Sequence, residues 1–114
     1  MVIAAQDQFV EGAREHGLYT VEGDAPATNR AYKKLSLALK ELREMPDRGE
    51  GFLAGLIQNE DLSVVTWAAL YLLPSRPEEA VQALQRVAGE GKSLIAFDAE
   101  MTLKEWRAGR LKVD

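Results

Sequence analysis

A nearly unbroken apolar run extends from Leu62 to Leu73, in which only Ser63 and Thr66 are polar. A membrane-spanning helix needs about 20 apolar residues in a row, so this run is too short to cross a bilayer. Its leucines and alanines favour a helix over a buried strand. Because a helix that is apolar on nearly all sides must be surrounded by other helices, the run predicts the central helix of an all-helical domain.

The residues after this run predict an amphipathic helix. Ser75 precedes Glu78 by three residues, which is the spacing of a capping box, and Pro77 falls in the first turn, where its missing N–H is not needed. The apolar positions that recur at helical spacing are Ala80, Leu84, Val87 and Ala88. We expect the helix to end at the glycines that begin with Gly89.

The residues before the run predict three further helices. The clearest starts after a Thr28 cap and ends before Pro46. Its apolar stripe is Ala31, Leu35, Ala38, Leu39, Leu42 and Met45. A first helix is expected from Ile3 to Glu15, with His16 at its end, and a short one around residues 52–57. Residues 17–28 are rich in Gly, Pro and Asp and predict a loop.

The last helix is expected from Ser93 to Ala108. Its inward side should carry Ile95, Ala99, Leu103 and Trp106. With this helix the chain holds about six helices joined by turns, which leaves no segment for a sheet. The pattern thus predicts an all-α fold over residues 1–114, as a single domain.

Composition narrows the functional classes. The chain has 114 residues, a net charge of −4, no cysteine and one histidine. Without cysteines there is no disulfide, thiol nucleophile or thiolate metal site, and one histidine cannot build the usual zinc sites. The acidic balance disfavours nucleic acid as a partner. The N-terminus has no signal-peptide pattern, so we expect a cytoplasmic protein. We also expect that it has no cofactor and does not bind membranes.

Two segments carry a family resemblance. The segment LAGLIQNEDLSVVTWAALYLL resembles a HEAT-type repeat, with an acidic turn at Glu60 and Asp61 and with Val64 opening the second helix. The segment FDAEMTLKEWRAG resembles the C-terminal signature of a small bacterial HEAT-like family of unknown function. The resemblance implies an α-α superhelix with two to three antiparallel helix pairs. It implies no established activity.

Four residues near the C-terminus are candidates for a functional surface. Trp106 is a possible binding anchor, because its large ring lies among charged neighbours such as Arg107. Asp98 and Glu105 are seven residues apart and so share one side of a helix, where two carboxylates could act as an acid/base pair or hold a cation. The alternative interpretation of these carboxylates is a solvated helix face.

Two functional hypotheses follow. The first is a non-enzymatic protein-binding module, of which an immunity or inhibitor-type protein is one subtype, that recognises another protein through its acidic surface. The second is a small-ligand binding or hydrolytic protein with a pocket near Trp106, Asp98 and Glu105. The sequence leaves open the identity of the partner and whether the chain forms a homodimer.

Overall fold

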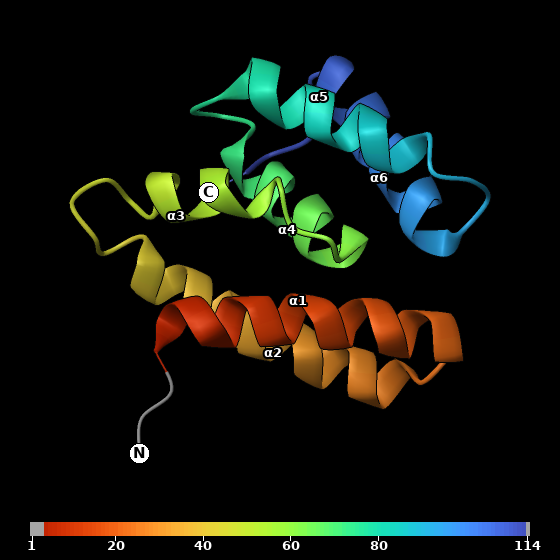
Figure 1. Cartoon of the computed structure of the whole chain (residues 1–114), viewed down its shortest axis with the longest axis horizontal. Helices are drawn as coiled ribbons and strands as arrows, with labels where there is room; N and C mark the ends of the chain where they lie inside the picture. Colours follow the sequence, from red (N-terminus) through yellow and green to blue (C-terminus); the bar gives the residue numbers. More distant parts are fainter. Residues whose placement is uncertain (1–3, 114) are drawn as a thin grey trace. The chain divides into compact units, whose positions relative to one another are not determined.

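The computed structural model describes residues 4–113, and this part of the chain is all-helical without any strand (Figure 1). Its elements are α1 (Ala5–Glu22), α2 (Ala25–Leu42), α3 (Glu50–Leu56), α4 (Leu62–Leu72), α5 (Pro77–Ala88) and α6 (Leu94–Arg107). The predicted all-α class is confirmed. The chain divides into two compact units at the bond between Phe52 and Leu53. The assignment of a single domain stays a prediction, and Ile3, the expected start of the first helix, lies outside the described residues.

The apolar run forms α4, as predicted. Asp61 caps the helix, because its carboxylate accepts a hydrogen bond of 2.9 Å from the backbone N–H of Ser63. The side chains of α4 that are completely buried are Val64, Val65, Ala68, Ala69 and Leu72. A helix with so little polar surface is stable only because its neighbours remove it from water.

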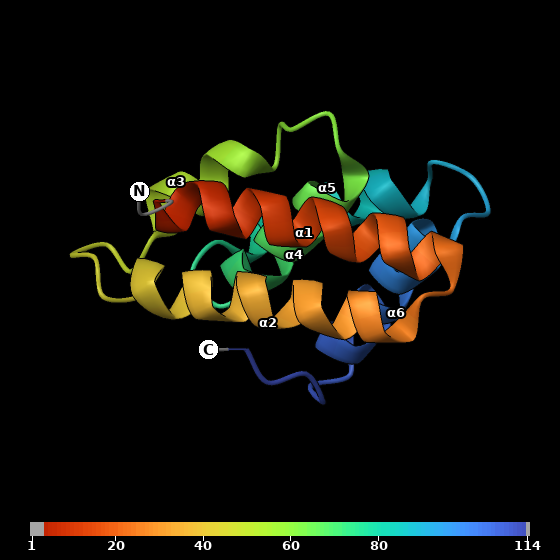
Figure 2. The same ribbon diagram turned by 90° about the horizontal axis from the view of Figure 1, so that it is seen from below.

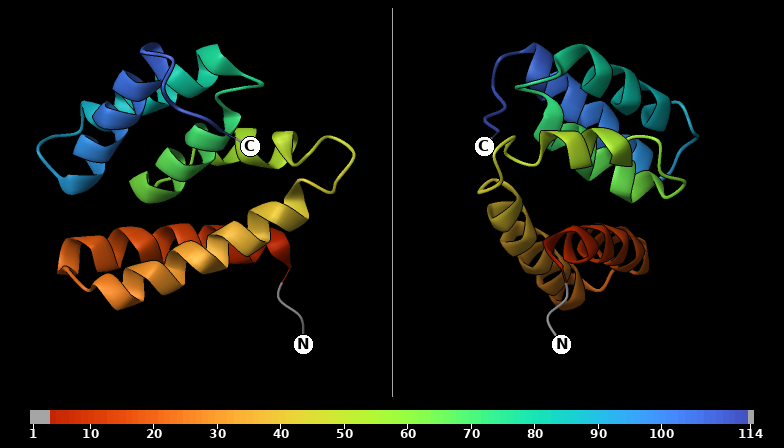
Figure 3. Two further views of the ribbon diagram at one scale, coloured as in Figure 1. Left: turned by 180° about the vertical axis from the view of Figure 1, so that it is seen from behind. Right: turned by 60° about the vertical axis from the view of Figure 1, so that its left-hand side comes forward.

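The second unit is built on packing among α4, α5 and α6. Helices α5 and α6 lie side by side, and α4 packs against both of them (Figure 3). The buried residues that α5 contributes are Ala80, Ala83, Leu84 and Val87. The Arg86 guanidinium also donates a hydrogen bond of 2.8 Å to the backbone carbonyl of Ile57, which ties α5 to the segment that follows α3.

The predicted loop over residues 17–28 is wrong. Helix α1 continues to Glu22, and only Gly23 and Asp24 separate it from α2. Gly23 adopts a left-handed conformation with φ of 76°, and the Asp24 N–H donates back to the carbonyl of Tyr19 at 3.0 Å. These bonds form a Schellman motif, which ends a helix and reverses the chain within two residues. His16 therefore lies inside α1, six residues before its end, and not at the predicted terminus.

Asp24, and not Thr28, caps α2. Its carboxylate accepts a hydrogen bond of 3.0 Å from the Ala27 N–H, and Pro26 occupies the first turn. Proline is tolerated there because the first N–H groups of a helix have no intrahelical partner. The glycine, proline and aspartate that predicted a long loop thus serve as the end of one helix and the start of the next.

Two other predicted boundaries also differ. Helix α2 ends at Leu42, four residues before Pro46, and the chain then turns until α3 begins at Glu50. The capping box at Ser75 does not form, because Arg76 is the N-cap of α5 and has no side-chain cap bond. The Ser75 hydroxyl donates instead to the backbone carbonyl of Leu72 at 3.4 Å.

Helices α1 and α2 form an antiparallel pair that packs closely along its length (Figure 2). The buried residues of the pair include four small ones, namely Gly12 and Ala13 on α1 and Ala27 and Ala31 on α2. At the rim, the Lys34 ammonium donates to the carboxylates of both Glu11 and Glu15 on α1. The hydrogen bond to Glu15, followed by that to Glu11, raises the pKa of Lys34 above its ordinary value.

Replacing Gly12 by alanine tests this close approach. A Cβ at Gly12 would lie 2.8 Å from the backbone nitrogen and 2.9 Å from the Cβ of Leu35 on α2. Relieving this overlap requires the two helix backbones to move apart. We expect Gly12→Ala to lower the free energy of unfolding by about 1–3 kcal/mol in urea denaturation, the range observed for overpacked cores.

Gly55→Ala is the matched control, because a Cβ at Gly55 in α3 meets nothing within 4 Å. Alanine is favoured over glycine in a helix by about 1 kcal/mol, so this variant should be as stable as the parent or more stable. If Gly12→Ala behaves like Gly55→Ala, the proposed steric contact between α1 and α2 is wrong.

Candidate functional site

All four predicted surface residues lie on α6. The Ser93 hydroxyl starts this helix by accepting a hydrogen bond of 3.0 Å from the Ala96 N–H. The helix ends in a second Schellman motif, in which Gly109 has φ of 73° and the Arg110 N–H donates to the Glu105 carbonyl at 3.0 Å. The predicted boundaries of this helix agree with the structure to within one residue at each end.

The inward side of α6 agrees with the prediction. Ala99 and Leu103 are buried, while Ile95 and Trp106 are half-buried. Trp106 therefore packs at the edge of the core and keeps part of its ring at the surface. Asp98 and Arg107 are exposed.

Asp98 and Glu105 are seven residues apart on α6. Seven residues along a helix correspond to a rise of about 10 Å between the two backbone positions. Within residues 4–113, no group of three or more potential ligands is placed to hold a metal ion. The two carboxylates lie on one side of α6, and their action as an acid/base pair or as cation ligands stays a prediction.

Glu105 forms an ion pair with Arg110. The Arg110 Nε donates to one carboxylate oxygen at 2.9 Å, and its Nη2 donates to the other at 3.0 Å. This two-pronged pair lowers the pKa of Glu105, chiefly through the hydrogen bonds and further through the positive charges of Arg110 and Lys104; partial desolvation opposes the shift. The pair also folds the chain after Gly109 back toward the end of α6.

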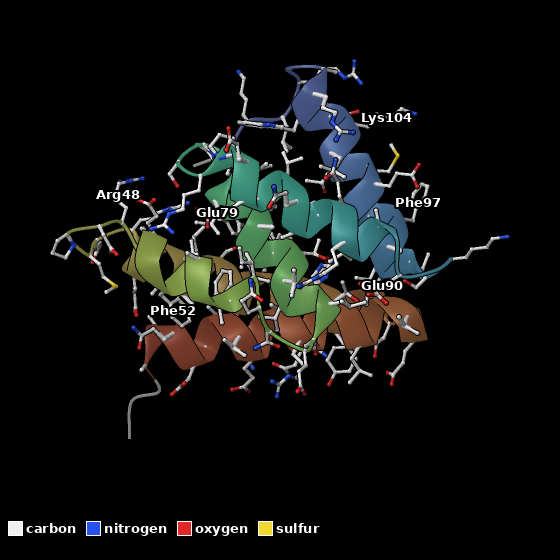
Figure 4. All side chains as sticks on the ribbon, turned by 45° about the horizontal axis from the view of Figure 1, so that its top comes forward. Arg48, Phe52, Glu79, Glu90, Phe97 and Lys104 are labelled. Atoms are coloured by element: carbon white, nitrogen blue, oxygen red, sulfur yellow. The ribbon has the colours of Figure 1, made fainter. Side chains whose placement is uncertain are left out.

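The outward side of α6 carries an apolar stripe that the sequence analysis did not identify. It consists of Leu94, Phe97 and Met101, which are 52%, 56% and 37% exposed. Their spacing of three and four residues places them on one line along the helix. Figure 4 shows Phe97 and Lys104 on the side of α6 that faces away from α5. We call these three residues the outer stripe.

The signal for the outer stripe is present in the sequence. In the segment LIAFDAEM, apolar residues follow the helical spacing on two opposite sides, not one. The inward set of Ile95, Ala99 and Leu103 accounts for the core, and the second set has no counterpart in the predicted core. Most globular helices have one apolar face, so the second apolar set of α6 is an unusual feature of this helix.

One open hollow of about 360 Å³ lies on the second unit, over the first turns of α5. It is lined by Pro77, Glu78, Val81 and Gln82 and contains none of the four predicted site residues. No helix in the described part of the chain has the length and apolar content needed to cross a membrane.

No protein-family model, no curated protein and no solved structure matches this chain. The resemblance to HEAT-like proteins therefore stays a prediction, and function has to be argued from the residues themselves.

The ion pair between Glu105 and Arg110 can be tested by following the carboxylate with NMR during a pH titration. We expect a pKa for Glu105 below the ordinary value of 4.5, and an increase toward that value in Arg110→Gln. Because the pKa is lowered in the folded state, the pair stabilises the fold above pH 4.5. That contribution is lost as the pH falls through the folded-state pKa.

Lys112→Gln is the matched control, since it removes one positive charge from the same segment without touching the hydrogen bonds to Glu105. It should leave the Glu105 pKa close to that of the parent. Equal pKa values in the parent and in Arg110→Gln would show that the pair does not form in solution.

Proposed function

We propose that this protein is a non-enzymatic protein-binding module that contacts its partner through the outer stripe of α6. The observation that carries the proposal is the exposure of Leu94, Phe97 and Met101 on a single helix line. Single exposed apolar residues are common, but a contiguous set on a regular helix face is a feature of interaction sites.

The energetics favour a protein partner. Burying an exposed Phe, Leu or Met side chain is worth about 1.5–3 kcal/mol each, so the outer stripe could supply a substantial part of a binding free energy. Aromatic residues and methionine are also enriched in interfaces. The charged side chains at its edges, including Asp98 and Lys104, would form the polar rim that surrounds such a core.

The finer parts of the proposal rest on sequence. A HEAT-like superhelix is compatible with the all-helical fold, and proteins of that kind commonly bind other proteins, which is an analogy of fold. The chain carries 18 acidic against 14 basic residues, which suits an immunity or inhibitor-type protein acting on a basic target. We propose the cytoplasm as its location.

Phe97→Ser tests the role of the outer stripe. Serine and phenylalanine have similar helix propensities, and Phe97 is more than half exposed, so the variant should fold like the parent. In a capture experiment with the tagged protein in lysate of its own host, we expect a stoichiometric partner to be retained by the parent. Phe97→Ser should lose it, with binding weakened about tenfold or more, as for a typical hot-spot residue.

Leu37→Ser is the matched control, because Leu37 on α2 is 65% exposed and lies outside the outer stripe. It should keep the same partner at the same yield. Circular dichroism and thermal unfolding of both variants would confirm that they are folded. A partner captured equally by the parent, Phe97→Ser and Leu37→Ser would contradict the proposal.

A further inference from the structure

We propose that the exposed side of α2 around Leu37 is a contact surface between two antiparallel copies of this chain. The surface consists of Lys33, Leu37 and Glu41, which follow one another at intervals of four residues. We call these three residues the α2 row. They lie on a different helix from the outer stripe, so the inference goes beyond the proposed function and is tested separately from it.

The centre of the α2 row is an apolar side chain that the core does not use. Leu37 is 65% exposed, which makes it the most exposed large apolar side chain in residues 4–113. The buried side of α2 is already formed by other residues, among them Leu35, Ala38 and Leu42. A single exposed leucine is common in proteins, so the inference depends on the charges that surround it.

The two charges of the α2 row are available for contact with a partner. Lys33 and Glu41 are exposed, and neither side chain has a hydrogen bond or ion pair with another residue in the range 4–113. The neighbouring Lys34 differs from them, because it is paired with Glu11 and Glu15 on α1. The α2 row therefore presents a free positive charge one turn before Leu37 and a free negative charge one turn after it.

This order of charges makes the α2 row complementary to itself. In two antiparallel copies, Lys33 of each faces Glu41 of the other, on both sides of a contact between the two Leu37 side chains. Such a pair has the two-fold symmetry that most homodimers have. Parallel copies would instead bring like charges together. Arg30 and Glu44, both exposed, repeat the same order one turn further out on each side.

Helix packing supplies a geometry for this contact. The commonest class of helix pair, with a crossing angle of about −50°, aligns rows of residues four apart on the two helices. The α2 row is such a row. Lys34 and Lys40 lie on the other row through Leu37, at a spacing of three, which is inclined by about 70° to the first. Lys40 therefore lies at the flank of the contact, where its ammonium stays in water.

Charge reversal tests the α2 row. In sedimentation equilibrium at low ionic strength, we expect the parent to form a dimer as its concentration rises to about 1 mM. Lys33→Glu and Glu41→Lys should each weaken association about tenfold or more, because each turns two ion pairs into two like-charge contacts. An equal mixture of the two variants should associate again, since an acidic row then faces a basic one. The double variant K33E/E41K should dimerise like the parent.

The other outcomes overturn the inference. A parent that stays monomeric up to about 1 mM would do so. Single variants that dimerise like the parent would also contradict it, as would a mixture that stays monomeric while circular dichroism shows both variants folded. A dimer that is lost in Phe97→Ser but kept in Lys33→Glu would place the second copy on the outer stripe instead. The proposed function is judged separately, by whether the captured partner is lost in Phe97→Ser.

Discussion

The burial of one side of α6 against α4 and α5 decides which of its side chains face water. Ala96, Ala99 and Leu103 are removed from solvent in this contact, and the helix cannot rotate without exposing them. Because an α-helix repeats every 3.6 residues, that choice places Leu94, Phe97 and Met101 on the opposite side. The candidate site is therefore a consequence of how the second unit packs, although its residues lie within one short stretch of sequence.

Local interactions fix both ends of α6. Ser93 starts the helix, and the glycine at 109 ends it with a left-handed residue. The ion pair of Glu105 with Arg110 then holds the following segment against the last turn. Asp98 and Glu100 are exposed on either side of the apolar part of the outer stripe.

The connection between α1 and α2 shows how composition can mislead. Gly23, Asp24 and Pro26 are residues typical of loops, and their density predicted an irregular segment. In the structure Gly23 ends α1, Asp24 caps α2 and Pro26 occupies the first turn of α2. The close packing of the two helices at Gly12 and Ala31 stabilises this tight connection. Neither the cap nor the contact can be inferred from residue type alone.

The sequence by itself determined the helical class and the approximate positions of most helices, because both follow from the periodicity of apolar residues. It also placed Ala99 and Leu103 on the inward side of α6. Only the tertiary structure decided that the second apolar set of α6 stays exposed, since burial depends on neighbours that are distant in the chain. The same holds for Glu105, whose shared helix side with Asp98 was visible in the sequence, while its capture by Arg110 depended on the turn at Gly109.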